Sequence, residues 1–415
     1  MQDLTITAIG AQGDGLSRAA DGKPAFVPLT LPGETVRAEM DGARGEAVEI
    51  LTPSADRAAP PCKHFGTCGG CALQHWAAEP YRAWKAEQIR LQLSMEGLET
   101  EILPIFAAPP ASRRRVALHA RKGGKGQGAR LGFKERRSWN LVPIEECPVT
   151  HPRLVAALPA LARLAEPFLE HPKSAPTLHV TLTGTGLDID VTGVERKSGG
   201  LSADARMRGA MAAGEGDFAR VTLAGEIVYG ARQPLVKLGA AVVALPPGAF
   251  LQAVPAAEKA MVDFAVAEAQ GASRVADLYC GVGTFTFRLA EIASVHAAEM
   301  SAPAIAALKA AIGAAPGLKP ITAEARDLVR RPVLGAELAK TDVVVIDPPR
   351  AGAAEQTVEI AKSKVAKVVG VSCNPATFAK DARALVDAGF RLEKVLPVDQ
   401  FVWSPHIELV GVFSR

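Results

Sequence analysis

Apolar runs rich in valine and isoleucine alternate with longer amphipathic stretches in the C-terminal part of the chain, from about residue 274 onward. Runs of this kind, separated by helical segments, predict a parallel β-sheet that helices cover on both faces. The final two apolar runs have no helical segment between them, so we expect the sheet to end in a hairpin. The predicted strands are 275–279, 294–298, 320–323, 343–346, 368–371, 392–396 and 407–413.

The first fifty residues show a different pattern, in which short strand-like runs are separated by glycine-rich turns. Short, evenly spaced strands predict a small β-barrel, and a plain β-module without a ligand fits the same pattern. Residues 53–61 are rich in proline and indicate a linker. The strand-like runs are 4–9, 25–28, 35–39 and 46–51.

The region between these two parts has a mixed pattern. The stretch 79–96 has helical periodicity, because Trp84, Gln88 and Leu91 recur at spacings of four and three. Further on, a helical run and two strand-like runs predict an α/β domain with a mainly antiparallel sheet. These runs are 154–169, 178–182 and 186–191.

The chain has 415 residues, enough for two or three domains. We therefore expect a β-barrel over 1–58, a mixed α/β domain over 59–240 and a Rossmann-like α/β domain over 241–415. The net charge of +3 does not by itself indicate a nucleic-acid-binding protein. The N-terminus lacks the pattern of a signal peptide, and no run of about 18 apolar residues occurs, so we expect a cytoplasmic protein without a membrane span.

A glycine-containing turn follows the first predicted strand of the C-terminal sheet. The strand ends at Tyr279 and leads into Cys-Gly-Val-Gly-Thr before a helix begins. Glycines at such a turn let a ligand approach the backbone closely, and tight turns alone also use them. The third glycine of the dinucleotide pattern is missing, and Glu299 ends the next strand, where a carboxylate can bind ribose hydroxyls. This layout is typical of class I S-adenosylmethionine enzymes.

Two further strands of the same sheet end in motifs with candidate chemistry. One leads into Asp347-Pro-Pro, and the next leads into Ser-Cys373-Asn-Pro. Because ligands of open α/β sheets bind outside the carboxyl ends of the strands, both side chains are expected in one crevice. Cys373 is therefore a candidate nucleophile. The alternatives are a plain turn for Asp347 and a small buried apolar residue for Cys373.

The cysteines in the middle of the chain form a second candidate site. Cys62, Cys68, Cys71 and Cys147 supply four thiols, and the six cysteines of the chain are too few for a disulfide framework. Four thiolates suit either a structural zinc ion or an iron–sulfur cluster. Zinc sites usually pair two Cys-x-x-Cys knuckles, and only one is present here.

A strongly basic segment lies between residues 113 and 137, where ten basic residues face one acidic residue, Glu135. So one-sided a charge in a nearly neutral protein indicates contact with the phosphates of a nucleic acid, and a solvated surface is the alternative. The basic residues are Arg113, Arg114, Arg115, Arg121, Lys122, Lys125, Arg130, Lys134, Arg136 and Arg137.

These motifs together resemble those of the RNA uracil-5-methyltransferases. The resemblance extends over essentially the whole chain and is carried by DLYCGVGTF, DPPRAG, VSCNPATFAKD, HIELV, FLQAV at 250–254, GFKERRS, PPCKHFGTCGGCALQHW and LPGE. It implies a class I methyltransferase fold in which Cys373 attacks carbon 6 of a uracil and Glu408 removes the carbon 5 proton. It also implies S-adenosylmethionine contacts for Gln252, Tyr279, Thr284, Glu299, Asp327 and Asp347.

Two residues depart from the pattern of that family. Thr284 stands where a cofactor-contacting asparagine is common, and Val254 stands where the family often has asparagine. Threonine can still donate a hydrogen bond, whereas the side chain of valine cannot.

The resemblance also implies an N-terminal TRAM-type RNA-binding barrel and a 4Fe-4S cluster on the four cysteines. Family members specific for transfer RNA typically lack both features, so 23S ribosomal RNA is favoured over transfer RNA as the substrate. We expect the enzyme to act as a monomer. The competing functions are a transfer-RNA enzyme, a small-molecule methyltransferase, and an inactive RNA-binding iron–sulfur protein.

Overall fold

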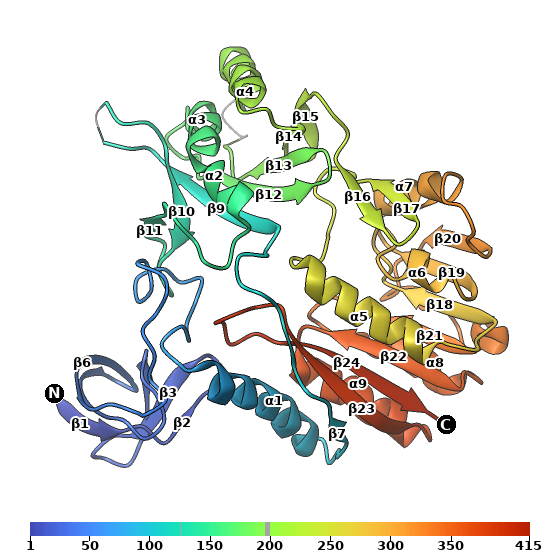
Figure 1. Ribbon diagram of the computed structural model, residues 1–415, viewed down its shortest axis with the longest axis horizontal. Helices are drawn as coiled ribbons and strands as arrows, with labels where there is room; N and C mark the ends of the chain where they lie inside the picture. The colour runs from blue at the N-terminus through green and yellow to red at the C-terminus, as the bar shows by residue number, and fades with distance from the viewer. Residues whose placement is uncertain (125, 196–199) are drawn as a thin grey trace.

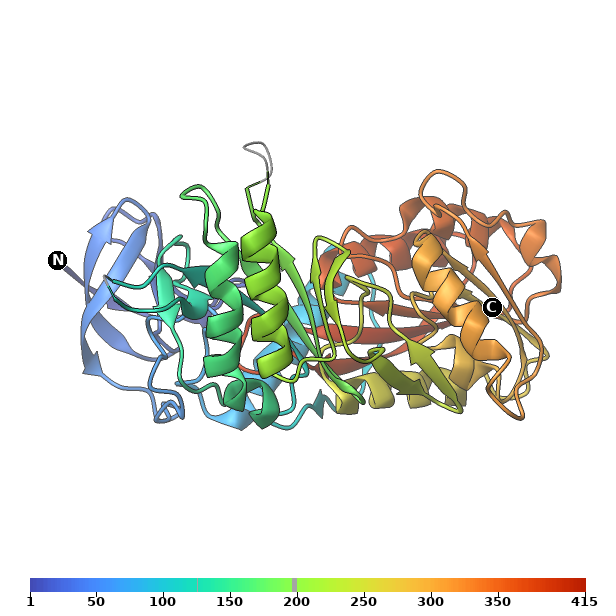
Figure 2. The same ribbon diagram turned by 90° about the horizontal axis from the view of Figure 1, so that it is seen from above.

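The computed structural model describes residues 1–124, 126–195 and 200–415, so Lys125 of the basic segment lies outside it. Figure 1 shows an N-terminal β-structure in blue, a central α/β part in green and a large α/β part in yellow to red. The view from above in Figure 2 shows these parts side by side along the long axis, with the two termini toward opposite ends. The described helices include none that is both long and apolar enough to cross a membrane.

The N-terminal part is a six-stranded sheet in the order β1-β5-β6-β4-β3-β2. The predicted run 4–9 is divided into two strands, β1 and β2, and its buried residues Leu4 and Ile6 pack with Val27 and Val36 in a small core. The strands are β1 (Gln2–Thr5), β2 (Ala8–Ile9), β3 (Asp14–Arg18), β4 (Pro24–Pro28), β5 (Thr35–Asp41) and β6 (Arg44–Thr52).

The central part is a seven-stranded sheet in which β13 and β14 run parallel and the other neighbours are antiparallel. The prediction of a mainly antiparallel sheet is therefore confirmed. The predicted helix 154–169 consists of two helices that meet at Ala157. Pro159 lies in the first turn of the second helix, where a proline is tolerated. The elements are β9 (Arg115–Arg121), β10 (Arg130–Lys134), β11 (Leu141–Pro143), α2 (Pro152–Ala156), α3 (Leu158–Phe168), β12 (Thr177–Thr183), β13 (Gly186–Thr192), α4 (Ala203–Glu215), β14 (Arg220–Leu223) and β15 (Glu226–Gly230).

The C-terminal part contains the predicted parallel sheet. Its order is β20-β19-β18-β21-β22-β24-β23-β7, and the terminal hairpin places β24 antiparallel between β22 and β23. The predicted Rossmann-like sheet and closing hairpin are thus confirmed. The strands are β18 (Arg274–Leu278), β19 (Ser294–Glu299), β20 (Ile321–Ala325), β21 (Val343–Ile346), β22 (Lys367–Ser372), β23 (Arg391–Asp399) and β24 (Glu408–Ser414).

Helices cover both faces of this sheet and bury an apolar core on each side. One core contains residues of α1, α8 and α9, and the other contains residues of α5 and α6. A small hairpin, β16 (Leu235–Leu238) with β17 (Ala241–Ala244), packs against α7. The helices are α1 (Ala78–Met95), α5 (Pro255–Glu268), α6 (Thr286–Leu289), α7 (Ala302–Ile312), the 3₁₀ helix η1 (Glu337–Lys340), α8 (Ala354–Lys362) and α9 (Pro375–Asp387).

The segment 78–107 belongs structurally to this large sheet although it precedes the central part in the chain. Helix α1 packs against α9 and β23, and β7 (Glu101–Ile102) and β8 (Phe106–Ala107) pair with β23. The predicted boundaries at 58 and 240 remain predictions. The pairing of β7 and β8 adds an early segment to the C-terminal α/β body, so this body is assembled from two stretches of the chain.

The predicted helix is present as α1, but none of the three residues that carried its periodicity, Trp84, Gln88 and Leu91, is buried. Leu91 is 42% exposed, whereas Tyr81, Lys85, Ile89 and Leu93 are buried. The buried stripe therefore contains a lysine, which the periodicity did not indicate. Trp84 is half-buried on another side, where its Nε1 donates to the carbonyl of Ile9 at 3.1 Å and ties the helix to the N-terminal sheet.

Lys85 forms a buried ion pair with Asp399 at the end of β23. Neither side chain is more than 2% exposed, and the ammonium also donates to the carbonyl oxygen of Phe401 at 3.0 Å. Burial lowers the pKa of Lys85 to about 8, while Asp399 acts in the opposite direction. A buried charge is tolerated only when it is paired and hydrogen-bonded, so each residue depends on the other.

We predict that Lys85→Met lowers the free energy of unfolding by about 3–5 kcal/mol, because Asp399 is left buried without a counter-charge. Lys259→Met is the matched control, since Lys259 is 76% exposed beside Asp263 and should cost less than about 1 kcal/mol. Urea unfolding followed by fluorescence measures both. Equal effects of the two substitutions would show that the buried pair has no special role.

Candidate functional site

The carboxyl ends of β18, β19, β21 and β22 meet at one edge of the large sheet, and the turn after β18 is built for close approach to a ligand. Tyr279, Gly281 and Gly283 all have positive φ angles. A Cβ atom at Gly281 would meet no atom within 4 Å, so the space beside it is open. A Cβ atom at Gly283 would lie 2.6 Å from the ring of Phe287, so that glycine serves packing instead.

Polar groups surround this turn as the sequence predicted. Glu299 accepts hydrogen bonds from the backbone N–H groups of Gly281 at 3.2 Å and Ser301 at 2.8 Å, which fixes its carboxylate beside the turn. Asp327 follows β20 and accepts from the N–H groups of Val329 and Arg330. Thr284 is half-buried just before α6.

Tyr279 provides a test of whether a cofactor fits here. Its hydroxyl is buried and has no hydrogen-bond partner among the described residues. Burial raises the pKa of Tyr279 to about 12, and nearby carboxylates that include Asp327 and Glu299 add to the rise. An unpartnered buried hydroxyl, open space beside Gly281 and an anchored carboxylate fit a nucleoside-type group with ribose hydroxyls.

A chain of buried hydrogen bonds crosses the crevice beside this turn. The Nε2 atom of Gln252 donates to Oδ2 of Asp347 at 3.2 Å, and Nε2 of Gln400 donates to Oε1 of Gln252 at 3.0 Å. Nε2 of Gln400 also donates to Oε2 of Glu408 at 2.6 Å. The structure therefore joins Gln252, Asp347 and Glu408 as one polar network, through a glutamine that the sequence analysis did not identify.

Both carboxyl groups of this network are held toward their neutral forms. Burial raises the pKa of Asp347 to about 7, and the hydrogen bond from Gln252 opposes the rise. Burial also raises the pKa of Glu408 to about 8, and Asp347 adds to the rise while Gln400 opposes it. Groups with pKa values near neutrality can give and take protons under physiological conditions.

Cys373 follows β22 at the same edge of the sheet, where the Asn-Pro pair fixes the start of α9. The Asn374 side chain accepts from the N–H of Ala376 and donates to the carbonyl of Arg350, which joins the turn to the loop after Asp347. The thiol is half-buried. Its pKa is raised by burial, then by the charges of Glu408 and Asp347, and Arg350 opposes the rise. The charges of both carboxyl groups thus act on the thiol.

Val254 has a structural explanation for its departure from the family pattern. It occupies the N-cap position of α5 without a side-chain cap and is 1% exposed within an apolar core. The side chain therefore packs instead of hydrogen-bonding. The preceding Gln252 still reaches Asp347, so the network does not need a polar residue at position 254.

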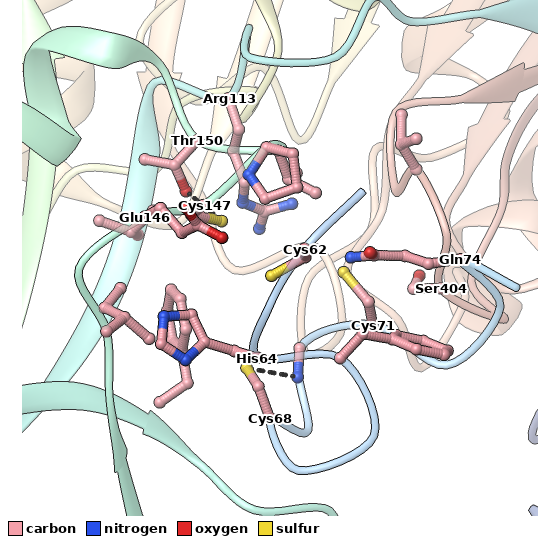
Figure 3. A pocket seen from close by; sticks show the side chains of 18 of the residues that line it. Cys62, His64, Cys68, Cys71, Gln74, Arg113, Glu146, Cys147, Thr150 and Ser404 are labelled. Carbon is pink, nitrogen blue, oxygen red and sulfur yellow. Dashed lines mark hydrogen bonds between the residues drawn. The ribbon is translucent and has the colours of Figure 1, made fainter. Parts of the chain in front are cut away.

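The four candidate cysteines line a separate cavity of about 360 Å³. Figure 3 shows the thiols of Cys62, Cys68, Cys71 and Cys147 directed toward this space from two segments far apart in sequence. All are free thiols, and burial raises the pKa of Cys71 to about 12. Among the described residues, no three His, Cys, Asp or Glu side chains converge as a site for a single metal ion. The thiols instead surround an open space.

The basic segment is only partly a free surface. Arg114 pairs with Glu258 at 2.6 Å and donates to the carbonyl of Gln252, and Arg115 donates to the carbonyl of Leu251. Arg113 donates to the carbonyl of Arg115 and lines the cysteine cavity. Arg114 and Arg115 thus hold the segment that carries Gln252, so their side chains are engaged within the protein, which the charge pattern did not indicate.

The remainder of the segment is more accessible. Lys122 and Arg130 are exposed, and the ammonium of Lys134 lies 3.7 Å from the ring centroid of Trp139, which is 78% exposed. Arg136 and Arg137 both pair with buried Asp14 of the N-terminal sheet, at 2.9 and 2.8 Å. Two arginines for one carboxylate leave an excess of positive charge where the N-terminal and central parts meet.

Comparison with known proteins agrees with this geometry. The model of the tRNA (uracil-5-)-methyltransferase family matches residues 241–415. An uncharacterized RNA methyltransferase of Caulobacter vibrioides is 90% identical over the full length of both chains. The 23S rRNA (uracil(1939)-C(5))-methyltransferase RlmD of Halomonas elongata is 34% identical, over 98% of this chain and 88% of its own length.

A solved structure has the same fold along the whole chain. It is the tRNA (uracil-54, C5)-methyltransferase of Pyrococcus abyssi in complex with S-adenosyl-L-homocysteine, with a TM-score of 0.71 at 23% identity over 99% of both chains. At this identity the likeness concerns the fold, and the relatives by sequence carry the assignment. The chain belongs to the family of S-adenosylmethionine-dependent RNA uracil-5-methyltransferases.

Proposed function

We propose that this enzyme methylates carbon 5 of a uridine in 23S ribosomal RNA through a covalent bond between Cys373 and carbon 6 of the base. The observation that carries the proposal is the hydrogen-bonded network that joins Asp347 to Glu408, at the sheet edge where Cys373 directly follows β22. Small-molecule methyl transfer to an amine needs neither a thiol nor a second proton acceptor of this kind.

We assign some residues of this site to cofactor binding and others to the reaction. S-adenosylmethionine, when bound, supplies the methyl group as a sulfonium and leaves as S-adenosylhomocysteine. Glu299 is placed to accept the ribose hydroxyls, and Tyr279, Thr284 and Asp327 surround the same space. Gln252 and Asp347 join this space to the base-binding side of the crevice.

Cys373 first gives its proton to water, because the thiolate is the nucleophile. Burial raises the pKa of the thiol and so makes this step harder. The thiolate bonds to carbon 6, and the electrons of the carbon 5–carbon 6 double bond move into an enolate, so that carbon 5 can bond to the methyl group. Glu408 then takes the proton from carbon 5. The electrons of that C–H bond restore the double bond and release the thiolate. The uridine must leave its stack to reach the thiol.

The covalent mechanism predicts different failures for the two catalytic residues. Cys373→Ala should bind RNA and cofactor but form no covalent species, whereas Glu408→Gln should attack and methylate, then retain methylated RNA on the protein. A denaturing gel with labelled RNA separates these outcomes. Activity of Cys373→Ala above about one-thousandth of the wild-type rate would contradict the mechanism. Normal product release by Glu408→Gln would assign the base to another residue.

We further propose that 23S ribosomal RNA is the substrate and that the N-terminal barrel, residues 1–58, is a TRAM-type RNA-binding module. The support is the 34% identity to the 23S ribosomal-RNA enzyme of Halomonas elongata and the excess of arginine beside Asp14. In this proposal residues 59–240 hold the cysteines and the basic segment, and residues 241–415 are the catalytic domain. The monomer acts alone in the cytoplasm.

RNA affinity should depend on salt through the exposed part of the basic segment. Lys122→Ala and Arg130→Ala are each expected to flatten the slope of log affinity against log salt by roughly one unit, since each lost phosphate contact releases one fewer counterion. Lys309→Ala, an exposed lysine of α7, is the control and should leave the slope unchanged. Filter binding at several salt concentrations measures the slopes, and unchanged slopes for Lys122 and Arg130 would reject the contact.

The cysteine cavity is proposed to hold a 4Fe-4S cluster on Cys62, Cys68, Cys71 and Cys147. The support is that all four thiols line one cavity, and that only one Cys-x-x-Cys knuckle is present where zinc sites usually pair two. The N–H of Gly70 donates to the sulfur of Cys68, and the hydroxyl of Thr150 donates to that of Cys147, which suits thiolate ligands.

Protein purified without oxygen should therefore be brown and contain about four irons and four acid-labile sulfides per chain. Cys68→Ala should lose this iron and weaken RNA binding more than cofactor binding, because the cavity lies outside the cofactor crevice. Cys280→Ala is the control and should retain the iron, since Cys280 is buried in the turn after β18. One zinc per chain without sulfide would overturn the assignment.

A further inference from the structure

Gln400 occupies the centre of the buried network although no motif identified it. It follows the end of β23 and is 2% exposed. Its single amide nitrogen donates to two acceptors, Oε1 of Gln252 and Oε2 of Glu408. A side-chain amide nitrogen carries two hydrogens, so both are used and the orientation of the amide is determined.

The orientation has a direct consequence for the carboxyl group of Glu408. Among the described residues, Gln400 makes the only side-chain hydrogen bond to Glu408. Gln252 makes no contact of this kind with Glu408: its amide nitrogen donates to Asp347, and its oxygen accepts from Gln400. The Oε2 atom of Glu408 is therefore held by Gln400, and the other oxygen accepts no side-chain hydrogen bond from the described residues.

The backbone on both sides of Gln400 is also fixed. Asp399 is held by the buried ammonium of Lys85, which also binds the carbonyl of Phe401 at 3.0 Å. These contacts clamp the residues immediately before and after Gln400. Since a side chain can position another only if its own backbone is immobile, the ion pair gives Gln400 the rigidity that the role requires.

We propose that Gln400 is a positioning residue for the methyl-transfer reaction, which aligns the carboxylate of Glu408 for removal of the carbon 5 proton and links it through Gln252 to Asp347. The inference rests on the proposed covalent mechanism and adds a residue to it. Gln400 acts through Glu408 and Gln252.

The charges around Glu408 agree with this role. Burial and the negative charge of Asp347 raise the pKa of Glu408, and the hydrogen bond from Gln400 is the influence that lowers it. Glu408 and Asp347 also raise the pKa of the Cys373 thiol, and Arg350 opposes them. The neighbouring charges of Lys85 and Asp399 are paired with each other. Removal of the Gln400 donor should therefore make the charged base harder to form.

The test uses the full-length holoenzyme and separates formation of the RNA adduct from its resolution. Gln400→Met is similar in size and has no donor. It should form the Cys373 adduct at the wild-type rate but release methylated RNA at least about tenfold more slowly at pH 7, from the loss of a hydrogen bond to a charged group. In a plot of the release rate against pH, the midpoint of the acidic limb should shift to a pH about one unit higher, so that release approaches the wild-type rate at high pH.

A second variant and a matched control keep the result interpretable. Gln400→Glu has the same shape but places a carboxyl group against Glu408, so the acidic limb of its release profile should also shift to higher pH. Gln356→Met removes the two hydrogen bonds between a buried glutamine of α8 and Val333, outside the network. It should leave the acidic limb of the release profile at the wild-type pH. Thermal unfolding of all three variants measures any general loss of stability.

The possible outcomes test the role of Gln400 separately from the covalent mechanism. If both Gln400 variants keep the wild-type midpoint of the acidic limb in the pH profile of release, the positioning role is overturned. A release rate lowered equally at every pH would do the same, because it would indicate only general damage. Absence of any Cys373 adduct in the wild-type enzyme would instead overturn the proposed covalent mechanism itself.

Discussion

The buried ion pair between Lys85 and Asp399 is the contact on which the arrangement of the enzyme depends. It joins helix α1, which precedes the central part in the chain, to the last strands of the catalytic sheet. A charge pair inside a protein contributes little net stability, but breaking it is costly, so it specifies one arrangement of the two segments. The apolar contacts of Ile89 and Leu93 with the same core stabilise the arrangement that the pair selects.

From this contact, one loop extends to both candidate sites. Residues 400–407 connect β23 to β24, with Gln400 at one end and Glu408 just beyond the other. Between them, Phe401 and His406 line the cysteine cavity. The carbonyl of Trp403 accepts from the N–H groups of Ala72 and Leu73, directly after Cys71. One short loop thus joins the cysteine cavity to Glu408, the proposed base.

Sequence patterns predicted the catalytic part well, because buried parallel strands are continuous apolar runs and their ends carry recognisable motifs. The closing hairpin around Glu408 is an example. The buried stripe of α1 was not identified from the sequence, since Lys85 looks like a surface residue until its partner is known. The roles of Arg114 and Arg115 were hidden for the same reason. Gln400 gave only a weak signal, a polar residue after an apolar strand, and its partners are distant in sequence.

The most direct test is to identify the nucleoside that the enzyme makes and its position in the RNA. Ribosomal and transfer RNA from cells lacking the gene, and from the same cells complemented with the wild-type or the Cys373→Ala protein, should be compared by nucleoside mass spectrometry and mapping. The account predicts that one 5-methyluridine of 23S ribosomal RNA disappears and returns only with the wild-type protein. Unchanged 23S ribosomal RNA with a loss of 5-methyluridine from transfer RNA would contradict the proposed substrate. Restoration by Cys373→Ala would contradict the chemistry.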